Sequence, residues 1–407
     1  MSVDHVAVLG AGLMGTATAL MLARSGVRVT LFEGQPAPMQ GASRWNEGKI
    51  HLGYLYAADG SLSTARRVLS GGVAFMPIIE SLIGESLNGH FTEHDDLYLI
   101  HRDSVVPLES VSDYFNTLTR EIRSQAATSR YLCDLSRADV QHLNADEFER
   151  LDLPPSITGG FRVPERSVDT IWIADRLAAA LEAEPLVELL ANVQVNGARP
   201  LCDERGSWDV LAQNSSEGPF DWVVNALWFG RLAVDVSAGL SVIPGWSHRH
   251  RLSVFASTHR PLALPSAVVG FGPFGDVKNY DGRHFYLSWY PAGLTVESGA
   301  VAPPTPPPID PVVVAAATRA GLGSLLPWIE EILDNATRVD IRGGWVFAQG
   351  CGSLEDPTAT LHRRDLFGIR RRGRYLSVDT GKYSSAPLLA ARLSATILGR
   401  PLEEQWS

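Results

Sequence analysis

Three glycines near the N-terminus stand at a spacing that can bind phosphate. Gly10, Gly12 and Gly15 lie in GAGLMG, between a buried strand expected over 6–9 and a helix expected over about 13–25. The first glycine allows a tight turn, the second lets the backbone approach a pyrophosphate, and the third lets the helix pack against the sheet. The helix N-terminus adds N–H groups and the positive end of a dipole. This stretch therefore predicts a dinucleotide-binding turn.

A carboxylate follows at the distance that a ribose requires. The second apolar strand, expected over 27–32, ends at Glu33, 21 residues after Gly12. An acid in this position accepts a hydrogen bond from a ribose hydroxyl, and its charge disfavours a 2′-phosphate. The uncharged run over 6–23 is long enough to raise the alternatives of a membrane span or a secretory signal. Glycines interrupt the run and no Lys or Arg precedes it, so two elements joined by a turn are favoured.

The composition is that of an ordinary globular protein. The chain has 407 residues, of which 45% are hydrophobic and 20% charged, with a net charge of −10. This balance argues against nucleic acid or an anionic membrane as the main partner, because both favour basic patches. The three cysteines, Cys133, Cys202 and Cys351, are far apart and show no metal-binding spacing. We expect no metal site, no transmembrane segment and a reduced, cytoplasmic setting.

Two domains are expected to be interleaved along the chain. After Glu33 the sequence enters a polar loop and then a helix over about 63–87, and the simple alternation of strand and helix stops. Three later stretches, LVELLANVQVNGAR, SWDVLAQ and DWVVNALWF, are predicted to be short strands that return to the first sheet. We predict a nucleotide-binding domain over 1–80, 155–235 and 340–407, and a substrate domain over 81–154 and 236–339.

The order of the motifs resembles that of a known superfamily over nearly the whole chain. GAGLMG with Glu33, the loop SRWNEGKIH, a VDT segment that opens a helix, VVNA, and the final SVDTGKYSSAP resemble the FAD-dependent oxidoreductases related to D-amino acid oxidase, glycine oxidase and sarcosine oxidase. NEGKIHLGYLYAADGSLSTARRVLSGG is similar to the 2-hydroxyglutarate dehydrogenase branch. Trp228 and Phe229 depart from the pattern, because relatives usually carry Ala-Gly-Ala-Trp there. No cysteine lies in the final turn, so a cysteine-linked flavin is not expected.

The resemblance implies a fold and a cofactor. The fold class is α/β, with a Rossmann-like FAD-binding domain and an interleaved α+β substrate domain on a mostly antiparallel sheet. We expect one non-covalent FAD per chain. The implied cofactor-binding residues are Gly10, Gly12, Leu13, Met14, Gly15, Glu33, Gly34, Ser43, Arg44, Asn46, Gly48, Lys49, Ile50, Val193, Ala226, Leu227, Trp228, Gly381, Lys382, Tyr383 and Ser384.

Three residues are candidates for catalysis. His51 is the first, because an imidazole titrates near neutrality and can accept the proton of a substrate hydroxyl or amine while hydride moves to the flavin N5. A histidine packed in the core is the alternative. Tyr286 and Lys382 are the other two, and the resemblance places Lys382 at the pyrimidine edge of the flavin.

Four residues are candidates for holding the substrate. They are Tyr54, Tyr286, Tyr290 and Arg342, the last as a fork of donors for a carboxylate. A surface salt bridge is the alternative for Arg342. In the strand over 284–290, even-numbered and odd-numbered residues face opposite sides, and the sequence leaves open which set faces the pocket.

The expected function is an FAD-dependent oxidoreductase, either an oxidase or a dehydrogenase. It would take a hydride from a C–N or C–OH bond of a small polar substrate such as an amino acid, an amine or a 2-hydroxy acid. Oxygen or a quinone is the expected electron acceptor, and the sequence does not choose between them. The alternatives are a flavin monooxygenase of a biosynthetic pathway, or a non-catalytic protein that kept the flavoprotein fold.

Overall fold

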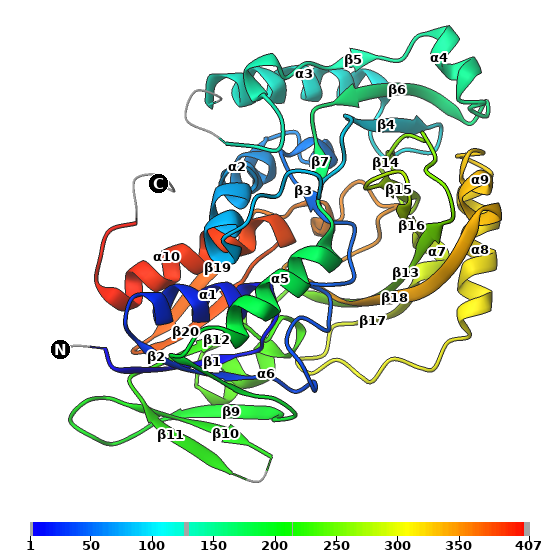
Figure 1. Ribbon diagram of the computed structural model, residues 1–407. Helices are drawn as coiled ribbons and strands as arrows, with labels where there is room; N and C mark the ends of the chain where they lie inside the picture. Colours follow the sequence, from blue (N-terminus) through cyan, green and yellow to red (C-terminus); the bar gives the residue numbers. More distant parts are fainter. Residues whose placement is uncertain (1–2, 126–129, 214, 403–407) are drawn as a thin grey trace.

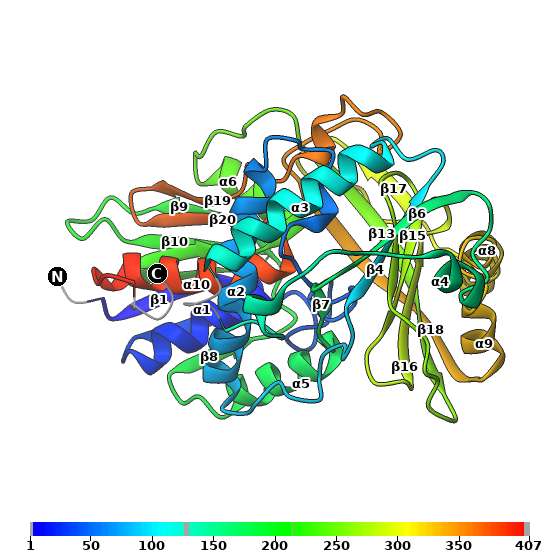
Figure 2. The same ribbon diagram turned by 90° about the horizontal axis from the view of Figure 1, so that it is seen from above.

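The fold is built on two large β-sheets that lie side by side (Figure 1; Figure 2). The computed structural model describes residues 3–125, 130–213 and 215–402. The first sheet has six strands in the order β19-β20-β12-β1-β2-β8, and all neighbours are parallel except β19 and β20. These strands are β1 (His5–Leu9), β2 (Arg28–Phe32), β8 (Val187–Leu190), β12 (Trp222–Asn225), β19 (Gly368–Arg372) and β20 (Tyr375–Asp379).

Helices cover one face of this sheet. Its strands β1, β2, β12 and β20 are almost fully buried, as expected for parallel strands covered on both faces. The covering helices are α1 (Leu13–Arg24), α2 (Ser63–Ile83), α5 (Thr170–Glu182) and α10 (Ala386–Leu398). Near the carboxyl edge lie two short helices, η1 (Tyr54–Tyr56) and η6 (Tyr383–Ser385). The predicted helices and the predicted parallel sheet are thus confirmed.

A small antiparallel sheet covers the opposite face. It contains β9 (Val195–Pro200), β10 (Trp208–Ala212) and β11 (Ser216–Phe220), and packs with α6 (Arg231–Ser237) beside the first sheet. The prediction that the strands around 195–212 return to the first sheet is therefore wrong for β9 and β10. β9 mixes buried with exposed residues and β10 mixes buried with half-buried ones, which is typical of a sheet with one face turned toward solvent. Of these stretches only β8 and β12 pair within the six-stranded sheet, β8 at its edge beside β2.

The second large sheet has nine strands and is mostly antiparallel. Its order is β17-β13-β16-β15-β14-β4-β6-β5, with β18 on the free side of β13, and only β14 and β4 are parallel neighbours. The strands are β4 (Asp96–His101), β5 (Gln141–His142), β6 (Ile157–Val163), β13 (Ser247–Thr258), β14 (Ala267–Gly270), β15 (Gly275–Asn279), β16 (His284–Trp289), β17 (Leu294–Ser298) and β18 (Ala336–Ala348). The predicted interleaved antiparallel sheet is confirmed.

Helices cover the outer side of the nine-stranded sheet. Figure 2 shows α8 (Pro311–Gly323) and α9 (Ile329–Asp334) on the side away from the six-stranded sheet. Phe285 and Leu287 of β16 are buried in the core beneath these helices. The remaining helices are α3 (Leu108–Gln125), α4 (Ala145–Arg150) and α7 (Tyr290–Gly293). Within the described ranges, no helix combines the length and apolar composition needed to cross a membrane.

The chain passes between the two sheets several times. The predicted boundaries near 155 and 340 fall beside β6 and inside β18, and both strands pair within the nine-stranded sheet. The limits of the two domains remain a prediction, since sheet pairing alone does not define a domain. The crossings themselves matter for the site, because loops from both sheets meet at the carboxyl ends of β1 and β2.

A buried ion network connects the segment after β2 to the nine-stranded sheet. Lys49, in the short strand β3 (Lys49–Ile50), donates to the Asp96 carboxylate over 2.5 Å, and Lys278 of β15 donates to the same oxygen over 2.6 Å. All three side chains are at least 97% buried. Burial alone would raise the pKa of Asp96, but the two ammonium groups outweigh it and hold that pKa below its usual value.

Replacing this central carboxylate should strongly destabilise the fold. In Asp96→Asn the two buried lysines lose their shared counter-charge, and removing one partner of a buried ion pair costs about 3–5 kcal/mol. Asp175→Asn is the matched control, because Asp175 pairs with Arg44 at the surface, where such a pair contributes about 1 kcal/mol or less. Urea unfolding of both variants measures the difference. Equal losses in the two variants would show that the network does not support the fold.

Candidate active site

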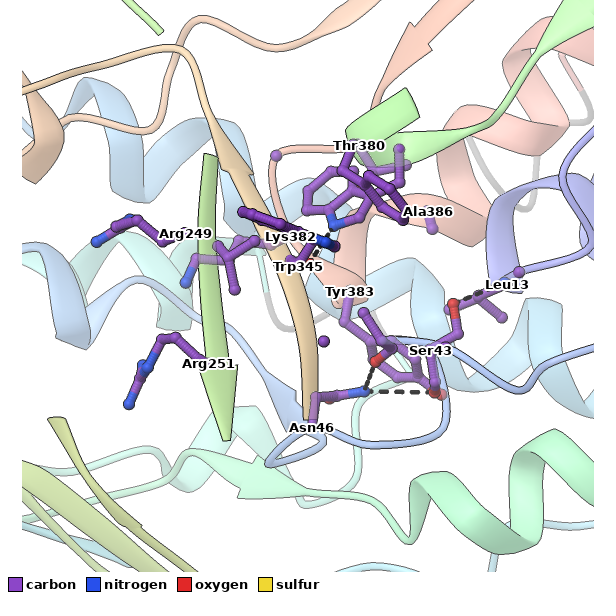
Figure 3. Close-up of a pocket in the computed structure, with 18 of the residues that line it drawn as sticks. Leu13, Ser43, Asn46, Arg249, Arg251, Trp345, Thr380, Lys382, Tyr383 and Ala386 are labelled. Atoms are coloured by element: carbon purple, nitrogen blue, oxygen red, sulfur yellow. Dashed lines mark hydrogen bonds between the residues drawn. The ribbon is translucent and has the colours of Figure 1, made fainter. Parts of the chain in front are cut away.

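One large cavity lies where the two sheets face each other. Its volume is about 940 Å³, at the upper end of the ~300–1,000 Å³ usual for ligand sites. Residues after β1 and β2 line one end, and side chains from β13 and β16 line the other. Figure 3 shows Leu13 and Ser43 at one side, Arg249 and Arg251 at the opposite side, and Lys382 between them. The cavity thus has two chemically different ends.

The glycines of GAGLMG take the geometry that their spacing predicts. Gly10 has a φ of +93°, which favours glycine, and permits the turn out of β1. A Cβ on Gly15 would lie 1.8 Å from the Gly10 carbonyl oxygen, so α1 can approach this turn only without a side chain there. A Cβ on Gly12 would meet only Ser43 Oγ, at 3.0 Å. Gly12 therefore keeps space open at the N-terminus of α1, whereas Gly15 serves packing and does not line the cavity.

Two side chains hold this end of the cavity in shape. Glu33 accepts hydrogen bonds from the N–H groups of Ala11 and Gln35, each over 2.8 Å. Its carboxylate lines the cavity and retains further lone pairs for a ligand. Ser43 accepts from the Leu13 N–H over 2.9 Å, which ties the second loop to the start of α1. The loop and the glycine turn are therefore one structural unit.

The second loop is organised by Asn46. Its amide donates to the Ala42 carbonyl over 2.8 Å and accepts from the Gly48 N–H over 2.8 Å. Gly48 has no room for a side chain, because its Cβ would lie 2.0 Å from the Val168 carbonyl. Arg44 turns away from the cavity and pairs with Asp175. Residue types alone do not show which of these side chains shape the loop and which contact a ligand.

Most of the predicted site residues line the cavity. Those that do are Gly10, Gly12, Leu13, Met14, Glu33, Gly34, Ser43, Asn46, Lys49, His51, Ala226, Leu227, Trp228, Tyr286, Tyr290, Gly381, Lys382 and Tyr383. Predicted residues outside the lining are Gly15, Arg44, Gly48, Ile50, Tyr54, Val193, Arg342 and Ser384.

Three of the residues outside the lining have other contacts. Tyr54 is fully buried and shares a 2.7 Å hydrogen bond with Thr119, while its neighbour Tyr56 lines the cavity instead. The N–H of Val193 donates to the Glu33 carbonyl over 2.9 Å. Arg342 is exposed, with its guanidinium 5.5 Å from the centre of the Trp45 ring. The substrate-clamping role predicted for Arg342 thus has no support from its position.

His51 lies in the cavity wall. We call the end of the cavity formed by β13 and β16 its polar end. Its side chain is buried, and its Nδ1 has no hydrogen-bond partner and stands 3.9 Å from the Glu165 carboxylate. Burial, followed by the charges of Lys382 and Lys49, holds the pKa of His51 well below its usual value. The imidazole is therefore neutral near pH 7.

The strand over 284–290 presents its even-numbered residues to the cavity. Tyr286 and Tyr290 line it, whereas Phe285 and Leu287 point into the core under α8 and α9. The Tyr286 hydroxyl accepts from Ser253 over 3.1 Å. Burial raises the pKa of Tyr286, so it stays protonated and serves as a hydrogen-bonding group. The sequence left open which face of this strand lines the pocket. The packing of the odd-numbered residues in the core shows that it is the even-numbered face.

Three arginines that the sequence analysis did not single out surround the polar end. Arg249 and Arg251 come from β13, and Arg364 from the segment between β18 and β19. We call these three residues the arginine cluster. Arg249 and Arg251 are two residues apart in a strand, which puts both on one face. The alternation in HRHRLSV was therefore a usable signal, whereas nothing in the sequence marks Arg364.

Lys382 and Tyr56 lie beside the arginine cluster. The Lys382 ammonium is 5.7 Å from the centre of the Tyr56 ring. Burial, and then the charge of Arg364, lowers the pKa of Lys382 to about 8. The Tyr56 hydroxyl is buried without a hydrogen-bond partner among the described residues. An uncommitted phenol in a cationic wall is suited to bind a ligand oxygen.

Two carboxylates also reach this part of the cavity. Burial disfavours the charge of Glu47, but Lys382 and Arg251 stabilise it and keep its pKa below the usual value. Asp276 of β15 differs, because burial raises its pKa to about 6 against the opposing charge of Lys278. Glu47 therefore compensates part of the positive charge near Lys382.

The two-sheet fold and this cavity define a dinucleotide-dependent oxidoreductase. The chain belongs to the family described as FAD dependent oxidoreductase, whose sequence profile matches residues 5–384. Its cofactor is accordingly FAD. The family match confirms the resemblance drawn from the motif order.

Solved structures with the same fold cover several chemistries. Glycine oxidase from Geobacillus kaustophilus matches with a TM-score of 0.68 and 17% identity, over 98% of this chain and 96% of that chain. L-α-glycerophosphate oxidase from Mycoplasma pneumoniae with FAD bound gives 0.62 and 19%, over 99% and 96%. L-proline dehydrogenase from P. horikoshii gives 0.65 and 14%, over 100% and 96%. At these identities the likeness shows the fold alone.

The residues at the glycine end fit FAD. The open space above Gly12, the N-terminus of α1 and the Glu33 carboxylate suit a pyrophosphate and a ribose. The β9 residues Val195 and Asn196 extend the cavity beyond Glu33, where the adenine of a dinucleotide would lie. Space and donor set thus agree with the cofactor that the family uses.

A side chain at Gly12 should displace the cofactor and leave the fold intact. In Gly12→Val the new side chain meets only Ser43 and fills the space needed for a pyrophosphate, so we expect FAD affinity to fall about tenfold or more, equal to ~1.4 kcal/mol. Gly299→Val is the control, because Gly299 has open space around it and lies outside the cavity. Flavin absorbance per chain and thermal unfolding decide the matter. Full flavin content in Gly12→Val would remove this residue from the site.

Proposed function

We propose that this protein oxidises a C–N or C–OH bond of a small, amino-acid-like or hydroxy-acid substrate that carries a carboxylate or similar anion. The observation that carries the proposal is the arginine cluster beside a neutral, partner-free His51 in the same cavity as the glycine turn. Guanidinium groups bind carboxylates in a fixed orientation. A substrate held there presents its α-carbon and its amino or hydroxyl group toward His51.

Each residue has a distinct task in this proposal. Bound FAD supplies the acceptor for a hydride from the substrate carbon. Gly12, Ser43 and Glu33 hold the cofactor at one end, and Lys382 places a cation at the other end, where negative charge develops. The arginine cluster binds and orients the substrate anion. His51 takes the proton from the substrate hydroxyl or amine.

Glu47 distinguishes two kinds of substrate. Its carboxylate is suited to bind a protonated amino group, which would favour oxidation of a C–N bond over a C–OH bond. The names of the structural neighbours include both glycine or proline and glycerophosphate enzymes, so both bonds remain in the proposal. The electron acceptor, oxygen or a quinone, and the cytoplasmic setting stay predictions from the sequence.

A substrate screen tests the proposed function directly. The purified holoenzyme is mixed anaerobically with amino acids, amines and 2-hydroxy acids, and loss of flavin absorbance near its visible maximum reports reduction. We expect compounds with a carboxylate to reduce the flavin, and amines that lack an acidic group to fail. Reduction only by amines that lack an acidic group would contradict the role given to the arginine cluster. Readmission of air then shows whether oxygen reoxidises the flavin.

His51→Ala should slow flavin reduction by about 10²-fold or more, the usual scale for loss of a general base. FAD content should not change, since Gly12 and Glu33 lie at the other end of the cavity. Because burial keeps the wild-type imidazole neutral, the wild-type rate should not fall as the pH drops through 6.5. Stopped-flow reduction with the best screened substrate measures both effects.

His250→Ala is the matched control, because His250 is a partly buried histidine of β13 that hydrogen-bonds Thr295 outside the cavity lining. It should reduce at the wild-type rate. If His51→Ala also reduces at that rate with its flavin intact, His51 is a packing residue and the base lies elsewhere.

A further inference from the structure

Buried cations outside the arginine cluster are paired with carboxylates. Lys49 and Lys278 share Asp96, at 2.5 and 2.6 Å, and Arg231 lies 3.1 Å from Asp235. This is the expected arrangement, because an unpaired charge away from water is costly. In this fold, buried cations with a structural role are thus paired with carboxylates.

The arginine cluster departs from this rule. Among the residues that the structure describes, no carboxylate oxygen comes within 4.0 Å of a guanidinium nitrogen of Arg249, Arg251 or Arg364. Arg249 is nevertheless 4% exposed. The three guanidinium groups, one buried and two half-buried, thus line the cavity without a carboxylate in direct contact, and Glu47 and Asp276 offset part of the charge of Arg251 from a greater distance.

Most donors of the cluster are also uncommitted. Arg249 Nη1 donates to the Tyr290 hydroxyl over 3.0 Å, and Arg251 Nη2 donates to the Ser288 hydroxyl over 2.7 Å. The Nε atoms of both residues are buried without a hydrogen-bond partner. Arg364 makes one long bond, 3.4 Å, to a backbone carbonyl. A guanidinium has five N–H donors, so each arginine has several left for a ligand.

The members of the cluster lie close enough to repel one another. Burial, and then the charge of Arg249, lowers the pKa of Arg364 to about 10. The Arg251 guanidinium lies 4.6 Å from the centre of the Tyr290 ring, and that tyrosine's hydroxyl bonds Arg249. Tyr290 therefore lies between Arg251, at its ring, and Arg249, at its hydroxyl, and Arg364 lines the same cavity. The cluster has two subsites with one phenol between them.

We propose that the substrate carries two anionic charges, one bound by Arg251 and the other by Arg249 with Arg364. This inference rests on the proposed function and specifies its substrate class. One carboxylate satisfies one guanidinium through two parallel hydrogen bonds and would leave the other subsite with unpaired charge. Glu47 offsets part of the charge of Lys382, so that lysine adds less to the positive charge of the site than the arginines do. A dicarboxylate and a phosphate monoester share the required chemistry.

Binding of simple anions to the FAD-loaded protein tests this without any turnover. The ligands are glutarate against butyrate, succinate against propionate, and inorganic phosphate, all at one ionic strength set with chloride. The change in the flavin spectrum gives each dissociation constant. A second charge-assisted contact contributes about 1.5 kcal/mol or more, so dicarboxylates should bind about tenfold tighter than the matched monocarboxylates.

Variants assign the second charge to its subsite. Arg364→Met should abolish the advantage of the dicarboxylate and leave monocarboxylate binding within about twofold, whereas Arg342→Met, an exposed arginine outside the cavity, should change neither. Arg364→Lys keeps a charge and should retain part of the advantage. If Arg364→Met fails to hold flavin, Arg364→Lys and the wild-type series still decide.

The outcomes distinguish a dicarboxylate from a phosphate monoester, and the two-anion proposal from the proposed function. Phosphate binding tighter than both acid classes, and lost in Arg364→Met, supports a phosphate monoester as the substrate. Equal binding of mono- and dicarboxylates, together with weak phosphate binding, overturns the proposal. Anion binding is independent of flavin reduction, so failure of the substrate screen would contradict the proposed function and leave this result standing.

Discussion

The contact of Lys49 and Lys278 with one buried carboxylate, Asp96, is the constraint on which the site depends. Lys49 follows directly on the loop that carries Ser43 and Asn46, while Asp96 and Lys278 belong to the nine-stranded sheet. Glu165 adds a second carboxylate 3.5 Å from Lys49 and accepts from the N–H of Leu52 over 2.7 Å. The network thus fixes the loop before and after His51 against the opposite sheet.

This attachment explains how one cavity can serve two ligands. The glycine turn and Ser43 belong to the six-stranded sheet and its loops, and the arginine cluster comes mostly from the other sheet. A small relative shift of the sheets would change the distance between cofactor and substrate, on which hydride transfer depends steeply. Charges paired in the wall keep the geometry, and charges left unpaired in the cavity are available for binding.

Site residues could be predicted from the sequence where a short stretch of chain determines their position, and not where distant elements do. Gly10, Gly12 and Glu33 could be predicted, because a turn between strand and helix imposes its residue types over a short stretch. The even-numbered face of β16 could not be chosen, because Phe285 and Leu287 are buried by helices that come later in the chain. Arg342 and Arg251 lie in neighbouring strands, β18 and β13, and both stand next to apolar residues. Only the packing of the whole fold decides that Arg251 lines the cavity and that Arg342 is exposed. Tyr54 and Tyr56 are two residues apart in the 3-10 helix η1, about two-thirds of a turn, so the two side chains face different sides, which the sequence does not distinguish.

The order of the chain has a consequence for biosynthesis. The turn over 380–383 closes the cavity beside the glycine turn of residues 10–15, and β20 pairs with β12 in the six-stranded sheet. A polypeptide still being translated lacks both of these parts until residues 375–383 leave the ribosome, long after the glycine turn has emerged. Cofactor capture at the complete cavity therefore has to wait for these residues, and the half-made chain must keep the free edge of β12 from other proteins until β20 arrives.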